Sequence, residues 1–165
     1  MNKRFLSRFA VLALILALGL LLGGGLSGRA QAFLGLFNGP AKVSPKNGEV
    51  RLPLKDLADG KARHYVYASG TTEIPFFVVQ SSDGVARAAF DACDVCYPAR
   101  KGYSQDGAYM ICNNCGQRFH VSRINEIKGG CNPAPLARRV DGSELVIRTA
   151  DLDTGAAYFQ GPAAP

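Results

Sequence analysis

Four cysteines in two close pairs are the residues of this chain best suited to chemistry. Cys93 and Cys96 form one C-x2-C pair, and Cys112 and Cys115 form a second pair after fifteen intervening residues. Each pair can turn two sulfurs toward one point, and two such turns supply the four thiolates that complete the shell of a soft or borderline metal. The same spacing serves zinc, a single iron ion or an iron–sulfur cluster. The pattern therefore predicts one metal centre, with a pair of disulfides as the alternative.

A fifth cysteine, Cys131, makes the cysteine count odd, so disulfides within one chain cannot pair all five thiols. Once four thiolates hold a metal, Cys131 is a further candidate ligand, a redox partner or an ordinary buried thiol. His120 lies five residues after Cys115 and is a weaker candidate ligand. A histidine beside a complete set of cysteine ligands is more typical of a residue that supports the metal loops.

The first 32 residues have the order of a secretory signal peptide. Three basic residues precede an apolar run from Phe9 to Leu22, a Gly-rich stretch follows, and Ala-Gln-Ala at 30–32 is a small-x-small cleavage site. We expect cleavage after Ala32, with an uncleaved N-terminal membrane anchor as the alternative. Both predict a domain in the periplasm or on the outer face of the cytoplasmic membrane. Thiols exported there oxidise unless a metal or a reductant protects them.

Charge and motif content exclude several classes of protein. The chain has a net charge of +6, but residues 1–32 hold four basic and no acidic residues, so the remainder carries only +2. Its basic residues are scattered, whereas nucleic-acid binding usually needs a basic stripe. The sequence has no Ser-His-Asp set, no local pair of carboxylates and no phosphate loop. A metal-binding or electron-transfer protein is therefore favoured over an enzyme.

The residues after the signal segment are expected to form one domain. We predict a linker at 33–48, a Cys-rich metal-binding domain at 49–150 and a flexible, Ala- and Gly-rich tail at 151–165. The β-prone segments are 49–54, 64–67, 74–80, 84–90, 109–111 and 144–148, with one helical turn at 54–57. The turn Ser82-Asp83-Gly84 predicts a hairpin between two of these segments. The fold class is therefore mainly β, a small antiparallel β-sandwich or barrel with the Cys-bearing loops at one end.

Three segments resemble the loops of Rieske-type iron–sulfur domains. Residues 83–93, 112–119 and 129–136 are similar to the approach to the first loop, the second loop and the Gly-Pro-rich third loop of that family. The resemblance implies a Rieske-like arrangement of the Cys-bearing loops. Cys96 and Cys115 stand where a Rieske domain has His, and loss of the His ligands would lower the potential of a two-iron cluster.

A closer resemblance is to the FtrD-like family of membrane iron–sulfur-containing proteins, which are linked to bacterial ferrous-iron uptake. Residues 89–98, 112–116 and 129–133 carry it, and they include Cys131-Asn132-Pro133 as well as both Cys pairs. The resemblance implies a membrane-associated protein with a Cys-bound iron or iron–sulfur centre and a membrane-associated iron-transport or redox partner. Many members carry a multi-span membrane region before this domain, whereas this chain has only its N-terminal apolar run.

Three functions are consistent with these observations. The leading hypothesis is a Cys-ligated iron or iron–sulfur centre in electron transfer or in iron uptake and trafficking. The second is a zinc-stabilised binding module that docks a membrane partner. The third is a thiol–disulfide oxidoreductase, which ranks last because the C-x2-C pairs lack the βαβ context of a thioredoxin fold.

Overall fold

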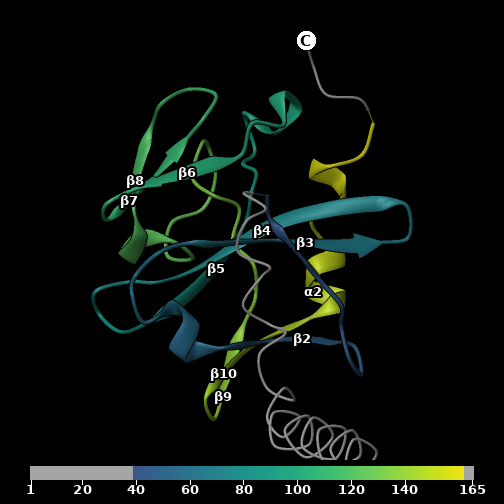
Figure 1. Ribbon diagram of the computed structural model, residues 1–165. Coiled ribbons are helices and arrows are strands. Elements are labelled where there is room, and N and C mark those ends of the chain that lie inside the picture. The colour runs from purple at the N-terminus through teal and green to yellow at the C-terminus, as the bar shows by residue number, and fades with distance from the viewer. Residues whose placement is uncertain (1–38, 162–165) are drawn as a thin grey trace, which may run out of the picture. The chain divides into compact units, whose positions relative to one another are not determined.

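Three small sheets make up the part of the protein that the computed structural model describes, residues 39–161 (Figure 1). The predicted signal segment, 1–32, lies outside these residues. The central sheet has the strand order β1-β3-β4-β5, formed by β1 (Ala41–Val43), β3 (Arg63–Ser69), β4 (Thr72–Gln80) and β5 (Ala86–Phe90). β1 runs parallel to β3, and the other neighbours are antiparallel. The hairpin predicted over residues 74–90 is thereby confirmed.

Two three-stranded antiparallel sheets flank the central one. The first has the order β2-β10-β9, from β2 (Glu49–Pro53), β10 (Glu144–Arg148) and β9 (Arg139–Asp141), and the second has the order β6-β7-β8, from β6 (Tyr103–Asp106), β7 (Tyr109–Cys112) and β8 (Arg118–His120). The helical elements are η2 (Leu54–Leu57), η3 (Tyr97–Ala99), η4 (Val121–Arg123), α2 (Thr149–Asp153) and η5 (Ala156–Tyr158). In Figure 1, β6–β8 lie on one side of β3–β5, and β2, β9 and β10 lie on the other.

The strand β4 is buried on both of its faces, which explains its unbroken apolar sequence. Ile74, Phe76 and Val78 belong to a core shared with the β2-β10-β9 sheet, whereas Phe77 and Val79 belong to a second core shared with the β6-β7-β8 sheet. All five side chains are fully buried. A strand covered on both faces reads as a continuous hydrophobic run instead of an alternating one.

The second core supports the Cys-bearing loops. It contains Cys93 and Cys112 together with buried hydrophobic side chains, and Cys96 and Cys131 pack against it. Its other buried members are Phe77, Val79, Ala89, Tyr103, Met110, Val121 and Ile124. The sulfur-bearing loops therefore rest on a close-packed apolar layer between the central sheet and β6–β8.

The predicted mainly β fold is confirmed, with three small, mostly antiparallel sheets and one short α-helix among residues 39–161. The packed domain includes residues outside the predicted 49–150 range. β1, within the predicted linker, hydrogen-bonds to β3. Leu152 and Phe159, within the predicted tail, are buried in the first core. Backbone pairing and apolar burial therefore extend the domain at both ends.

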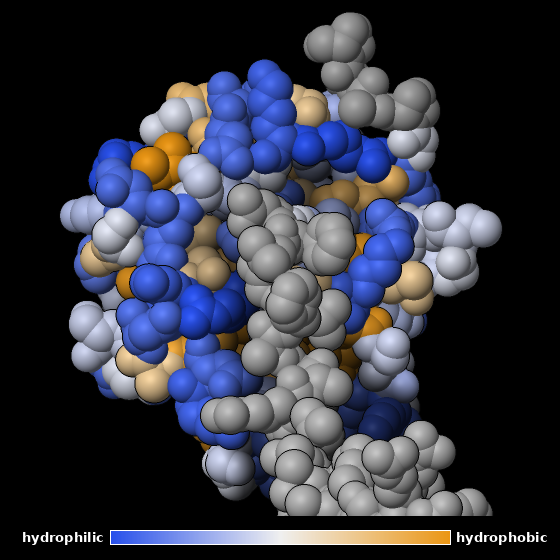
Figure 2. Space-filling model, in the orientation of Figure 1, coloured by the Kyte–Doolittle hydropathy of each residue, from blue (hydrophilic) through white to orange (hydrophobic). Residues whose placement is uncertain are grey.

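One face of the domain, the face drawn in Figure 2, is largely polar. The face drawn in Figure 2, outside its grey atoms, is mostly hydrophilic and is broken by small, separate hydrophobic spots. The large hydrophobic residues with the most exposure, Val95 and Val140, are 61% and 58% exposed and lie far apart in the sequence. Within residues 39–161, no helix has the length and apolarity that crossing a membrane requires.

Candidate metal centre

The first Cys pair follows directly from the end of β5. The backbone N–H of Asp91 donates to the Pro75 carbonyl, which keeps the chain on β4 for one more residue. Cys93 is then buried, and the chain turns so that the N–H of Cys96 donates to Cys93 Sγ at 3.2 Å. The N–H of Tyr97 donates to the Cys93 carbonyl and closes the turn. The Cys96 side chain is half-buried.

The second Cys pair occupies the turn between β7 and β8. Cys112 is the last residue of β7 and is buried, whereas Cys115 in the turn is exposed. The N–H of Cys112 donates to the Gln117 carbonyl, and the N–H of Gly116 donates back to the Cys112 carbonyl. Gly116 has a φ of +74°, a left-handed conformation that glycine adopts without a Cβ clash. This tight turn is what the C-x2-C-Gly pattern predicts.

Cys131 comes from a third loop that returns to the end of β5. The Tyr103 hydroxyl donates to the Cys131 carbonyl at 2.7 Å, so a buried aromatic residue of β6 holds the loop from the side of the second core. Three residues later, the N–H of Ala134 donates to the Ala92 carbonyl, directly beside Cys93. These contacts bring Cys131 to the first Cys pair across a long stretch of sequence.

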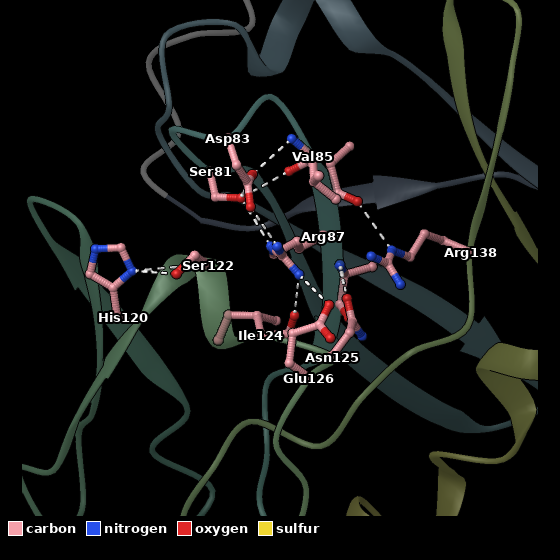
Figure 3. A network of polar contacts seen from close by, with 12 residues as sticks. Ser81, Asp83, Val85, Arg87, His120, Ser122, Ile124, Asn125, Glu126 and Arg138 are labelled. Atoms are coloured by element: carbon pink, nitrogen blue, oxygen red, sulfur yellow. Dashed lines mark hydrogen bonds and ion pairs between the residues drawn. The ribbon is translucent and has the colours of Figure 1, made fainter.

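The segment before this loop is held by Arg87, a buried arginine on β5 (Figure 3). Its guanidinium donates to the Ile124 carbonyl at 3.0 Å, to the Glu126 carboxylate at 2.8 Å and to the Asp83 carboxylate at 2.8 Å. Its Nε donates to Ser81 Oγ at 2.9 Å. Because a buried guanidinium is costly unless its donors are satisfied, these contacts fix residues 124–126 against the β4–β5 turn.

Asn125 adds a second attachment to β5 in the same region (Figure 3). Its side-chain oxygen accepts from the N–H of Ala88 at 3.1 Å, and its side-chain nitrogen donates to the Ala88 carbonyl at 2.6 Å. The Asn125 side chain therefore makes with Ala88 the pair of hydrogen bonds that the backbone of a neighbouring strand would make. The N–H of Leu136 also donates to the Ala88 carbonyl, so both ends of the Cys131 loop are fixed on one residue of β5.

The five thiols gather into two overlapping groups. Cys93, Cys96 and Cys112 have sulfurs that all lie within 4.8 Å of one another, and so do Cys96, Cys115 and Cys131. The Sγ atoms of Cys96 and Cys131 are 3.7 Å apart. All five cysteines are free thiols in the structure. The structure thus brings together every cysteine that the sequence proposed, as two sets of three that share Cys96.

The other candidate ligand, His120, lies outside both groups. Its Nδ1 is 2.7 Å from Ser122 Oγ and accepts from the Ser122 N–H, which caps the short helix η4. Its ring packs edge-on against Tyr109. The Nδ1 of His64 lies 3.6 Å from the Asp91 carboxylate, and its ring packs against Phe77. These contacts give both histidines roles in packing and capping.

Burial and backbone N–H groups set the acidity of the thiols in opposite directions. Burial raises the pKa of Cys112 to about 11, although the backbone N–H groups of Cys115 and Asn114 act to lower it. Burial also acts to raise the pKa of Cys93, but the N–H of Cys96 and further donors outweigh it and the pKa is lowered. The pKa of exposed Cys115 is lowered, chiefly by the N–H of Gln117. Donors aimed at sulfur stabilise the thiolate form that a metal needs.

The donor set fits a soft or borderline metal. Every ligand atom in the two groups is sulfur, which suits zinc, a single iron or an iron–sulfur centre and does not suit Mg²⁺ or Ca²⁺. A tetrahedral ion with metal–sulfur bonds of about 2.3 Å has sulfurs about 3.8 Å apart. The 3.7 Å separation of Cys96 and Cys131 matches that edge. The arrangement defines a mainly β protein with a thiol cluster able to bind a metal.

Comparison with known protein families gives this class a name. The family model described as membrane iron–sulfur-containing protein, FtrD-like, matches residues 57–159, a segment that includes all five cysteines. The chain therefore belongs to the FtrD-like family, as its Cys motifs predicted. Neither the curated proteins nor the solved structures include a significant match.

Proposed function

We propose that this protein transfers electrons in iron uptake or trafficking, with iron or an iron–sulfur cluster held by its cysteines. The observation that carries the proposal is the cluster of five thiols, which offers sulfur as its only kind of ligand. Membership of a family described as iron–sulfur containing supports iron as the metal. Such a centre, when bound, accepts and releases electrons at a potential set by its surroundings.

The positions of the thiols suit exchange of electrons with a partner protein. Cys93 and Cys112 are buried against the second core, so apolar side chains limit access of water from that side. Cys115, by contrast, is exposed. A partner that contacts the surface at Cys115 would therefore come within a short distance of the centre. We propose that this partner is a membrane-associated iron-transport or redox protein.

Two basic residues line the same pocket as three of the cysteines. A pocket of about 250 Å³ is lined by Cys93, Cys96 and Cys112 and also by Arg100 and Lys101. Positive groups beside a thiolate centre offset its negative charge and favour its reduced form. The Arg100 guanidinium is fixed by donating to the Gln160 and Gly161 carbonyls, at 2.6 and 2.8 Å.

The direct test is metal analysis and absorption spectroscopy of the full chain, purified from its native compartment without added metal. We expect iron, with visible absorption that changes on addition of dithionite, because thiolate-bound ferric iron and iron–sulfur clusters absorb there and zinc does not. Cys112→Ser should reduce both iron content and absorption. Val95→Ser, an exposed change in the first Cys turn, is the matched control and should leave both unchanged.

Folded protein that is colourless, free of iron and loaded with zinc would overturn the proposal. It would favour the zinc-stabilised binding module instead, because the sulfur separation of 3.7 Å suits zinc as well as iron. Iron content lost equally in Val95→Ser and Cys112→Ser would also contradict the assignment of the cysteines.

We further propose that the domain lies in the periplasm or on the outer face of the cytoplasmic membrane. The family is described as a membrane protein family, and basic residues precede the N-terminal apolar run. A reporter enzyme that works only outside the cytoplasm, fused after Pro165, should be active. Activity restricted to a reporter that requires the cytoplasm would contradict this location.

A further inference from the structure

We infer that the cysteine cluster holds two metal ions bridged by the thiolate of Cys96. The first position is formed by Cys93, Cys96 and Cys112, and the second by Cys96, Cys115 and Cys131. The inference deepens the proposed metal centre, but it rests only on metal binding by the cysteines and holds for zinc as well as for iron. It assigns Cys131 as a ligand. The single four-sulfur site predicted from the two Cys pairs becomes two three-sulfur sites that share Cys96.

The grouping of the sulfurs is the first argument. Cys96 is the one cysteine common to both sets, and it lies half-buried while Cys93 is buried and Cys115 is exposed. Cys131 approaches Cys96 to 3.7 Å, the spacing of two ligands on one tetrahedral ion. The Tyr103 hydroxyl donates to the Cys131 carbonyl at 2.7 Å and so fixes the backbone of the residue that carries the fifth thiol.

The backbone that follows Cys96 is the second argument. The sulfur of Cys93 accepts a hydrogen bond from the N–H of Cys96, three residues further along, at 3.2 Å. After Cys96, Pro98 has no N–H to donate, and the N–H of Ala99 donates to the Cys96 carbonyl and not to its sulfur. A thiolate that bridges two metal ions uses one more lone pair than a terminal ligand does. The backbone after Cys96 leaves that lone pair free of the hydrogen bond that the Cys93 sulfur accepts.

Charge is the third argument. Four thiolates around a single divalent ion carry a formal charge of minus two, and this charge would lie partly against the apolar second core. With two divalent ions the formal charge falls to minus one, which reduces the cost of burial. Each ion then has three protein thiolates, so one tetrahedral position on each is left for a ligand from outside the chain, such as sulfide.

Cadmium provides the test, because ¹¹³Cd is a spin-active substitute that prefers thiolate ligands. The full chain in mild detergent is reduced, freed of metal at low pH and reloaded with ¹¹³Cd²⁺ under argon. We expect two equivalents of cadmium per chain by mass spectrometry and two ¹¹³Cd resonances. Each resonance should be split by the other, because the two ions share the Cys96 sulfur.

Variants separate the two positions. Cys131→Ser should remove the resonance of the second position and leave that of the first as a single line. Cys93→Ser should remove the resonance of the first position and leave that of the second as a single line. Cys96→Ser should shift or remove both. Two unsplit resonances in the parent, or a Cys96→Ser variant that changes only one of them, would overturn the bridge. The stoichiometry and splitting are measured on the parent chain, so a variant that fails to fold does not remove the test.

The outcomes also separate this inference from the proposed function. A single cadmium equivalent would overturn the two-ion centre and leave the proposed iron function standing. Two coupled cadmium ions in a chain whose native form contains only zinc would support the two-ion centre and overturn the iron function.

Discussion

Replacing Asn125 by Ala should cost the domain about 4 kcal/mol of unfolding free energy. The Asn125 side chain is the hydrogen-bond partner of the Ala88 N–H, and Ala88 is fully buried. Loss of that partner leaves a buried donor unsatisfied, at a cost of about 1–3 kcal/mol. The Ala88 carbonyl keeps its bond from Leu136 and loses the one from Asn125, which adds about 1 kcal/mol.

The backbone of Asn125 contributes the remainder of this cost. Its φ is +72°, a left-handed conformation that asparagine tolerates better than alanine does, by about 1 kcal/mol. Asn125→Gly separates the two effects, because glycine removes the backbone penalty but restores neither hydrogen bond. We therefore expect Asn125→Gly to be nearly as unstable as Asn125→Ala. Asn125→Asp keeps the acceptor for the Ala88 N–H and should be intermediate.

Urea unfolding of the full, metal-loaded chain in mild detergent, followed by tyrosine fluorescence, measures these differences. Asn47→Ala is the matched control: Asn47 is exposed, its φ is +51°, and it should show only the backbone cost of about 1 kcal/mol. The reasoning is refuted if Asn125→Gly is as stable as the parent, because the hydrogen bonds to Ala88 would then contribute nothing.

Two further perturbations test other parts of the domain. Gly102→Ala should destabilise the domain by more than Gly107→Ala. Both glycines have positive φ, so the backbone cost is similar. A Cβ at Gly102 would lie 2.5 Å from the Asp91 carboxylate, whereas none of the described atoms lies within 4 Å of a Cβ at Gly107. Equal urea midpoints would contradict this. The Ser81 hydroxyl, with the Val85 N–H and Arg87, holds the pKa of Asp83 well below its ordinary value. The stabilisation is present above the unfolded-state pKa of about 4 and is lost as pH falls toward the folded-state value. The difference in stability between the parent and Asp83→Asn should therefore shrink from pH 7 to pH 3, and a constant difference would contradict the assignment.

Local patterns in the sequence were enough to predict six of the ten strands among residues 39–161 and the two Cys turns, whereas β1, β6, β8 and β9 were not predicted. The segment 74–80 predicted a strand because it is rich in Phe and Val, and the Cys112–Gly116 pattern predicted a tight turn. The same apolar run could not reveal that β4 is covered on both faces by different sheets, because a continuous run carries no periodicity. That information resides in the pairing of distant strands.

The position of Cys131 could not be predicted from its neighbours in sequence. Contacts of Arg87 and Asn125 with residues 37 positions away in the sequence bring its loop to the first Cys pair, and no local motif marks such pairs. The packing of the C-terminal segment could not be predicted from its composition either. Its Ala- and Gly-rich composition is typical of a flexible tail, yet a Cβ at Gly155 would overlap the Phe90 ring, so close packing requires the small residue there.

The contact between Cys96 and Cys131 has a consequence for how the domain holds together. The two residues are 35 positions apart, and the whole β6–β8 sheet lies between them in the sequence. A metal ion that joins them closes that loop, and a fixed link across a loop of this length raises the free energy of the unfolded chain by about 4 kcal/mol, because it removes conformational entropy. The ion would then act as a reversible cross-link that stabilises the β6-β7-β8 sheet. Depletion of the metal would loosen the β6-β7-β8 sheet before the central sheet and expose it to proteases, which ties the lifetime of the protein to metal supply.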